Sequence, residues 1–100
     1  MDIKASQTGD SGRLEIFGDI DEKGAEAFKA RLQELKTVKK VEIDFSRVGY
    51  IGSSGIGKLL LFYKNVTLEG GKVTVSNLSS DLYSLFRELK LDTIFTITQK

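Results

Sequence analysis

Short stretches in which apolar and polar residues alternate constrain the fold of this chain more than any other feature. The clearest is VEIDFS at residues 41–46, in which every second residue is apolar. A strand with this period has one apolar face and one polar face. Strands packed between two layers of helices are apolar on both faces. The sequence therefore predicts a sheet that carries its helices on one face only.

The same alternation recurs around residues 14–16 and 73–75, and we expect further short strands at residues 3–5 and 93–98. Three intervening stretches have apolar residues at helical spacing. The expected buried stripes are Ala25, Phe28, Leu32 and Leu35; Ile56, Leu59, Leu60 and Tyr63; and Leu82, Leu85, Phe86 and Leu89. A hairpin followed by alternating strands and helices predicts an α/β fold with a mixed sheet of about five strands.

The expected helix starts carry side chains that can accept hydrogen bonds from free backbone N–H groups. We expect Asp21 to cap the first helix and Ser53 or Ser54 to cap the second. For the third helix the candidates are Ser79, Ser80 and Asp81.

Length and composition limit the functions that this chain can have. One hundred residues supply one hydrophobic core, so we expect a single domain over residues 1–100, with a monomer as the default. The net charge of +1 offers no broad grip on nucleic acid or membranes. The chain has no Cys and no His, which excludes Ser-His-Asp and Cys-His catalysis and removes the usual zinc ligands. Its longest apolar run, LLLFY, is far below the roughly 20 residues of a membrane span, so we expect a cytoplasmic protein.

The glycine-rich stretch YIGSSGIGKL at residues 50–59 allows several interpretations. Gly52, Gly57 and Lys58 match most of a phosphate-binding loop, but Leu59 stands where that motif needs a hydroxyl. A nucleophile elbow fails because Ile56 replaces its second glycine. We therefore expect no enzyme, no cofactor and no metal. Either the serines only cap a helix, or one of them receives a phosphate.

The wider segment VEIDFSRVGYIGSSGIGKLLLFYKNV resembles the centre of the STAS family, especially its bacterial anti-sigma factor antagonists. In that family a strand of the type hydrophobic-Asp-hydrophobic-Ser precedes Asp-Ser-Ser/Thr-Gly-Leu-Gly and a helix. The matching residues here are 43–46 and 52–57. GDID at 18–21 and GGKVTV at 70–75 resemble further family segments, so the resemblance covers nearly the whole chain and implies a STAS-like fold.

The resemblance implies that Ser53 is phosphorylated, with Ser54 as second choice. It also implies that the unphosphorylated protein binds an anti-sigma factor, commonly a serine kinase of the histidine-kinase-like ATPase type, and releases it on phosphorylation. A serine phosphatase is a further implied partner. Physically, a phosphate at a helix start lies beside favourable backbone dipoles, yet would have to be desolvated at an interface.

The expected partner surface centres on the loop and the helix that follows it. Its residues are Tyr50, Gly52, Ser53, Ser54, Gly55, Ile56, Lys58, Leu61 and Phe62. One departure from the family matters, because Gly52 stands where relatives have Asp, and a carboxylate beside the serine is missing. The alternative is a STAS adaptor or ligand-binding module that acts without phosphorylation. We expect Asp44 to lie on the solvated sheet face without a catalytic role.

Overall fold

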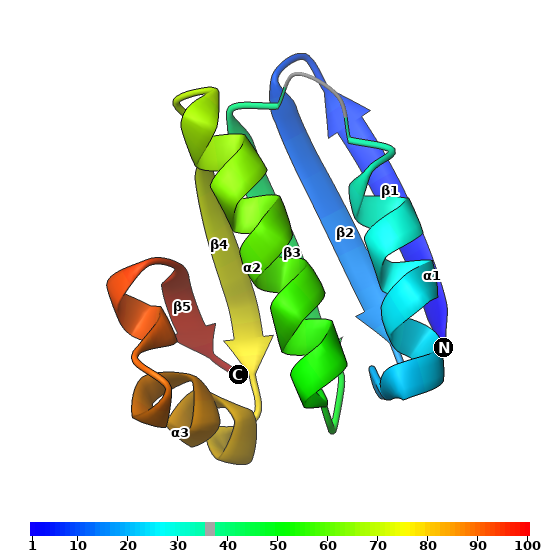
Figure 1. The fold of residues 1–100 in the computed structure, drawn as a ribbon, viewed down its shortest axis with the longest axis vertical. Helices are drawn as coiled ribbons and strands as arrows, with labels where there is room; N and C mark the ends of the chain where they lie inside the picture. The colour runs from blue at the N-terminus through cyan, green and yellow to red at the C-terminus, as the bar shows by residue number, and fades with distance from the viewer. Residues whose placement is uncertain (36–37) are drawn as a thin grey trace.

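The computed structural model describes residues 1–35 and 38–100. Within these residues the elements follow one another in this order (Figure 1): β1 (Asp2–Thr8), β2 (Ser11–Phe17), α1 (Glu22–Leu32), β3 (Lys40–Arg47), α2 (Ser53–Leu68), β4 (Lys72–Leu78), α3 (Ser80–Glu88), the 3-10 helix η1 (Leu91–Thr93) and β5 (Thr96–Gln99).

The five strands form one mixed sheet in the order β1-β2-β3-β4-β5. β1 and β2 form an antiparallel hairpin, and every other neighbouring pair is parallel. α1 and α2 lie side by side across one face of the sheet, and α3 lies beyond the end of β4 (Figure 1). This arrangement confirms the predicted α/β class and the mixed five-stranded sheet.

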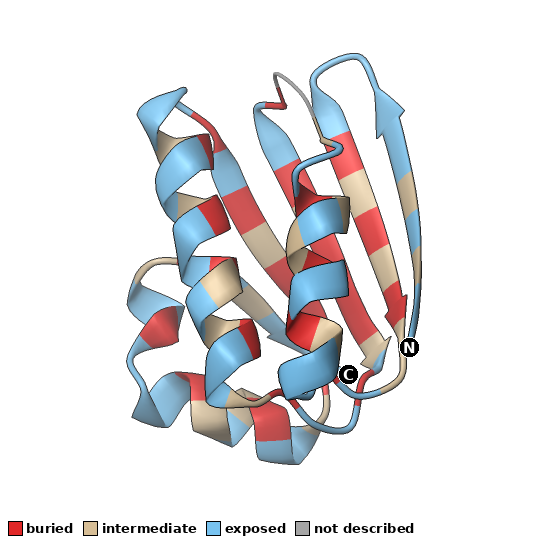
Figure 2. Cartoon of the chain, turned by 45° about the vertical axis from the view of Figure 1, so that its right-hand side comes forward, coloured by how far each residue is buried: buried red, intermediate tan, exposed pale blue. Residues whose placement is uncertain are grey.

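The core lies between the sheet and the helices. Leu14, Ile43 and Val75, on three neighbouring strands, are completely buried. Figure 2 shows the alternation of buried and more exposed residues along β2, β3 and β4. α3 joins the same core, because the ring of Phe86 meets that of Phe45 edge to face, with centroids 6.1 Å apart. The prediction that the sheet carries its helices on one face only is therefore confirmed.

The C-terminal strand is shorter than its sequence pattern predicts. Residues 93–98 are rich in β-branched and aromatic side chains and suggest one strand, but Thr93 ends η1 and β5 begins only at Thr96. Phe95 is 2% exposed, and its ring packs edge to face on Tyr63 at 5.3 Å. Burial of this one aromatic ring takes the chain out of the strand conformation before β5.

The buried stripe of α2 differs from the predicted one. The buried residues are Gly55, Leu59, Phe62 and Val66, whereas Leu60 is 36% exposed and Ile56 and Tyr63 are half-buried. Apolar spacing alone could not decide the register, because Ile56, Leu60 and Tyr63 follow the helical period as well as Leu59, Phe62 and Val66 do. In α1 the predicted buried stripe is confirmed as far as Leu32, where the helix ends. In α3 the predicted stripe is one residue too long, because Leu89 is 48% exposed.

Two of the three predicted helix caps are confirmed. Asp21 accepts a hydrogen bond from the backbone N–H of Gly24 at 2.8 Å, and Ser79 caps α3 by accepting from Leu82 at 3.2 Å. The prediction that Ser53 or Ser54 caps α2 is wrong. Gly52 occupies the cap position, and Ser53 is already the first helical residue.

Candidate partner-binding and phosphorylation site

Two loops meet where the parallel strands β2 and β3 end. The loop after β2 and the loop after β3 are joined by hydrogen bonds from Ile20 N–H to the carbonyl of Tyr50 (2.8 Å) and from Gly52 N–H to the carbonyl of Ile20 (2.9 Å). Asp19 adds a third bond, since its carboxylate accepts from Gly49 N–H at 3.2 Å. The start of α2 is therefore held by backbone pairing to the loop before α1.

Gly55 brings α2 close to this pair of loops. A Cβ atom on Gly55 would lie 2.7 Å from Ile20 Cγ2 and 2.9 Å from Ile51 Cγ1. Both isoleucines are buried and β-branched, so they have few alternative rotamers. The glycine is thus required by the close approach of the helix. Gly57 has open space around it and meets no such demand.

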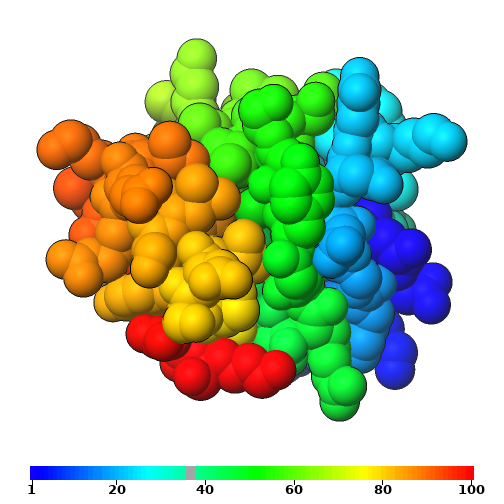
Figure 3. Space-filling model, turned by 90° about the horizontal axis from the view of Figure 1, so that it is seen from below, coloured from blue at the N-terminus to red at the C-terminus, as the bar shows by residue number. Residues whose placement is uncertain are grey.

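Ser53 and Ser54 are both exposed at the first turn of α2. The helix begins with a hydrogen bond from Ile56 N–H to the carbonyl of Gly52 at 3.0 Å. Seen from the end of the molecule where α2 starts, this green segment runs across the middle of the face, between the start of α1 and α3 (Figure 3). A serine hydroxyl here is open to another protein, and the helix start favours negative charge.

Apolar side chains accompany the serines on the exposed side of the loop and α2. Tyr50 is 52% exposed and Leu61 is 48% exposed. The phenol of Tyr50 lies back over the helix start, with its oxygen 3.1 Å from where a Gly52 Cβ would be. Leu61 points away from the core, as its helical position predicts.

The structure does not bring all nine predicted interface residues to the surface. Phe62 is 8% exposed within the core, and Gly55 is also buried, so neither offers a side chain to a partner. Lys58 is half-buried and pairs with Glu26 of α1 at 3.2 Å. The surface that remains consists of Tyr50, Ser53, Ser54 and Leu61, with Gly52, Ile56 and Lys58 at its border.

Sequence reasoning missed a polar cluster on the helix-free face of the sheet. Asp44 lies on this face as predicted, but its side chain is only 11% exposed. Its carboxylate accepts hydrogen bonds from Arg13 (2.9 Å), the backbone of Ser46 (2.9 Å) and Asn77 (3.1 Å). Burial acts to raise the pKa of Asp44, but these hydrogen bonds and the Arg13 charge outweigh it and hold the pKa below its usual value.

Glu42 completes this cluster. It pairs with Arg13 at 2.7 Å and accepts a hydrogen bond from the Ser76 hydroxyl at 2.7 Å. The Ser76 bond, assisted by Arg13, lowers the pKa of Glu42. The two-residue spacing of Glu42 and Asp44 indicated that both acids lie on one face of a strand. It could not indicate their partners, because these lie on other strands and depend on the register of the sheet.

In the ranges 1–35 and 38–100, no group of acidic side chains could hold a metal ion, and no helix is both long and apolar enough to cross a bilayer. The groups that this surface offers are two exposed serine hydroxyls and the exposed side chains of Tyr50 and Leu61.

Comparison with known proteins defines the class to which this fold and site belong. A family model described as "Mlab, STAS domain" matches residues 3–98. The chain therefore belongs to the STAS domain family, as its central motif predicts.

A protein from Bacillus subtilis (strain 168) named "Anti-sigma-B factor antagonist" is 28% identical to it over 101 residues, which covers 100% of this chain and 93% of that protein.

Solved structures show the same fold. A putative anti-sigma factor antagonist from Thermotoga maritima has a TM-score of 0.88 at 19% identity, covering 98% of this chain and 86% of its own. The Bacillus cell fate determinant SpoIIAA in its phosphorylated form has a TM-score of 0.76 at 18% identity, covering 99% and 93%.

Proposed function

We propose that this protein is a non-enzymatic anti-sigma factor antagonist that works by partner switching. Unphosphorylated, it binds an anti-sigma factor that is also a serine kinase of the histidine-kinase-like ATPase type. Phosphorylation of Ser53 ends the complex. The observation that carries the proposal is the exposed Ser53 at the first residue of α2, three residues after exposed Tyr50 and on the same helix as exposed Leu61, in a chain similar over its full length to an anti-sigma-B factor antagonist.

The surface fits a protein partner. Interface centres are enriched in aromatic side chains and depleted in charge, and Tyr50 and Leu61 supply apolar area around the two serines. Lys58 is partly neutralised by Glu26, which leaves the middle of the surface with little charge of its own. A partner could therefore bury Ser53 without leaving an unpaired charge.

A phosphate on Ser53 would change the surface without changing the fold. The first turn of α2 contains no acidic residue, and the Gly52 cap has no side chain to occupy the free backbone N–H groups. These N–H groups and the helix dipole favour a phosphate at this end. The phosphate adds about −1.5 to −2 charges at pH 7, which must lose water when a partner covers them. Folding is thus retained while association is weakened.

Gly52 favours a second candidate function, that of an adaptor whose binding does not depend on phosphorylation. The family motif that this chain resembles usually has Asp at this position, and its carboxylate could orient the serine hydroxyl. With glycine here, that group is missing. Such an adaptor would use the same surface, but a charge at position 53 would not control it.

The test is a quantitative pull-down from lysate of the source organism with four baits: wild type, Ser53→Ala, Ser53→Asp and the matched control Ser54→Asp. Captured proteins are identified by mass spectrometry. We expect wild type and Ser53→Ala to retain an ATPase of the stated type, and Ser53→Asp to lose at least about tenfold in affinity, since uncompensated interface charge costs about 2 kcal/mol or more.

The control separates a switch at Ser53 from general charge repulsion. Ser54→Asp introduces the same charge one residue along, about 100° around the helix, and should weaken binding less. Equal retention by Ser53→Asp and wild type would refute the phosphoswitch and favour the adaptor. Equal loss in both aspartate variants would show that Ser53 has no special role.

A further inference from the structure

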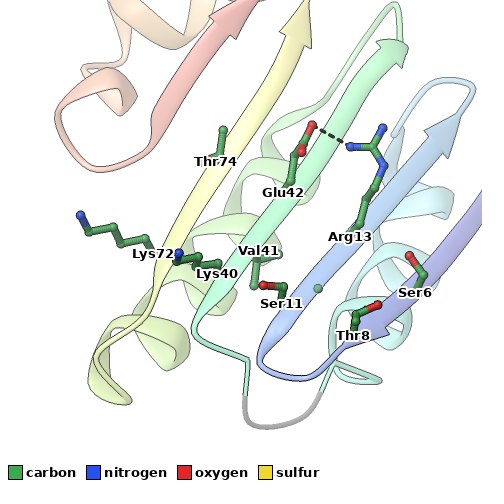
Figure 4. A pocket seen from close by; sticks show the side chains of 10 residues that line it. Ser6, Thr8, Ser11, Arg13, Lys40, Val41, Glu42, Lys72 and Thr74 are labelled. Carbon is green, nitrogen blue, oxygen red and sulfur yellow. Dashed lines mark ion pairs between the residues drawn. The ribbon is translucent and has the colours of Figure 1, made fainter.

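The helix-free face of the sheet contains a hollow of about 530 Å³. It lies near the start of β3 and β4, whereas Ser53 follows the end of β3. Figure 4 shows Lys40 and Lys72 on one side of this hollow and Ser6, Thr8 and Ser11 on the other. Its size falls within the usual range of small-molecule sites, about 300–1,000 Å³.

The strand register arranges the polar side chains of this face in rows that cross four strands. The first row is Thr8, Ser11, Lys40 and Lys72; the second is Ser6, Arg13, Glu42 and Thr74; the third is Lys4, Glu15, Asp44 and Ser76. Rows two and three each contain both signs of charge. The first row contains two lysines and no acid.

The two lysines are direct cross-strand neighbours, since Lys40 pairs with Lys72 in the β3–β4 register. Like charges at such positions repel each other. Neither ammonium group has an ion pair with any residue in the described ranges. The nearest acid in the register, Glu42, already pairs with Arg13 and accepts from Ser76. The protein thus leaves two neighbouring positive charges uncompensated at the hollow.

We propose that this hollow binds a small organic phosphate. The two ammonium groups match the double negative charge of one phosphate group. Figure 4 shows both lysine side chains extending away from Ser6, Thr8 and Ser11, so a phosphate at the ammonium groups leaves these hydroxyls to the organic part of the ligand, whose hydroxyls they can donate to or accept from. A nucleic acid or membrane surface would need a longer basic stripe, whereas the three acids of the other two rows, Glu15, Glu42 and Asp44, all pair with Arg13.

The test is a ¹⁵N–¹H NMR titration of the full chain with ribose 5-phosphate, with inorganic phosphate, and with sodium chloride at matched ionic strength. The double variant Lys40→Gln/Lys72→Gln removes the proposed phosphate ligands. Lys23→Gln/Lys64→Gln removes the same charge from exposed positions on α1 and α2 and serves as the matched control. Retained peak dispersion shows that each variant is folded.

We expect ribose 5-phosphate to give saturable shifts at backbone amides of residues 11–13, 40–42 and 72–74, with weaker binding of inorganic phosphate. Lys40→Gln/Lys72→Gln should lose at least tenfold in affinity, and the control should match wild type. Shifts that do not exceed those in sodium chloride, or that survive in Lys40→Gln/Lys72→Gln, overturn the proposal. Equal affinity for inorganic phosphate and ribose 5-phosphate means an adventitious ion only, which also overturns it. None of these outcomes depends on the proposed role of Ser53.

Discussion

Replacement of Gly55 by alanine tests whether close packing at the start of α2 holds the proposed binding surface in place. In the native fold the new methyl group would lie 2.7 Å from Ile20 Cγ2 and 2.9 Å from Ile51 Cγ1. Both atoms are attached directly to the Cβ of a buried, β-branched side chain, so rotamer changes cannot move them away cheaply. Either α2 or the paired loops must shift.

The magnitude follows from two opposing effects. Overpacking a tight site costs about 1–3 kcal/mol, while alanine is favoured over glycine within a helix by roughly 0.5–1 kcal/mol. The difference spans about 0 to 2.5 kcal/mol, and because two contacts are below 3.0 Å we expect Gly55→Ala to lower the free energy of unfolding by about 1–2 kcal/mol, toward the upper part of that range. Gly57→Ala is the matched control, because nothing lies within 4 Å of its added Cβ. That variant should gain about 0.5–1 kcal/mol.

Urea denaturation of both variants and wild type, followed by circular dichroism, measures these differences at constant m-value. For a chain of 100 residues, 1 kcal/mol corresponds to a shift in Tm of about 4–8 °C. A Gly55→Ala variant as stable as Gly57→Ala would refute the packing argument, because both substitutions make the same chemical change in the same helix.

Two further predictions concern the core and the polar cluster. Phe62→Ala should destabilise the fold by about 3–5 kcal/mol. Leu61→Ala should stay within about 0.5 kcal/mol of the stability of wild type and should weaken partner binding instead. Similar losses of stability for the two variants in urea denaturation would contradict the assignment of Phe62 to the core and Leu61 to the surface. Because the pKa of Asp44 is lowered in the folded state, the stability it contributes is present above its ordinary pKa and is lost as pH falls through the lower folded value. Asp44→Asn should therefore be less stable than wild type at pH 7 and should lose less stability on acidification below about pH 4. Urea denaturation between pH 3 and pH 7 checks this, and parallel pH profiles for the two proteins would contradict it.

Much of the fold could be predicted from local patterns. The alternation in residues 41–46 reflects which side chains face the helices, and that depends only on the two-residue period of a strand. Asp21 could be identified as a cap because capping is a contact over three residues. The glycine-rich motif likewise located the start of α2 beside an exposed serine.

The failures have a common physical cause, which is packing between segments distant in sequence. The register of α2 was misplaced because two apolar stripes share the helical period and packing against the sheet decides between them, and Phe62 was assigned to the partner surface although it lies in the core. The last strand was predicted too long because burial of Phe95 against Tyr63 is a tertiary contact. Partners of Asp44, such as Arg13 and Asn77, lie 31 and 33 residues away along the chain.

The central claim is that phosphorylation of Ser53 controls association with a kinase-like partner. The most informative experiment mixes the purified protein with the captured partner and Mg-ATP. Intact-mass measurement counts the phosphates incorporated, peptide mapping locates the modified residue, and gel filtration follows the complex. We expect one phosphate, located on Ser53, and loss of the complex in step with its appearance. Ser53→Ala should stay unmodified and bound. A complex that persists after Ser53 is phosphorylated, or that forms with no phosphate transfer at all, would contradict it.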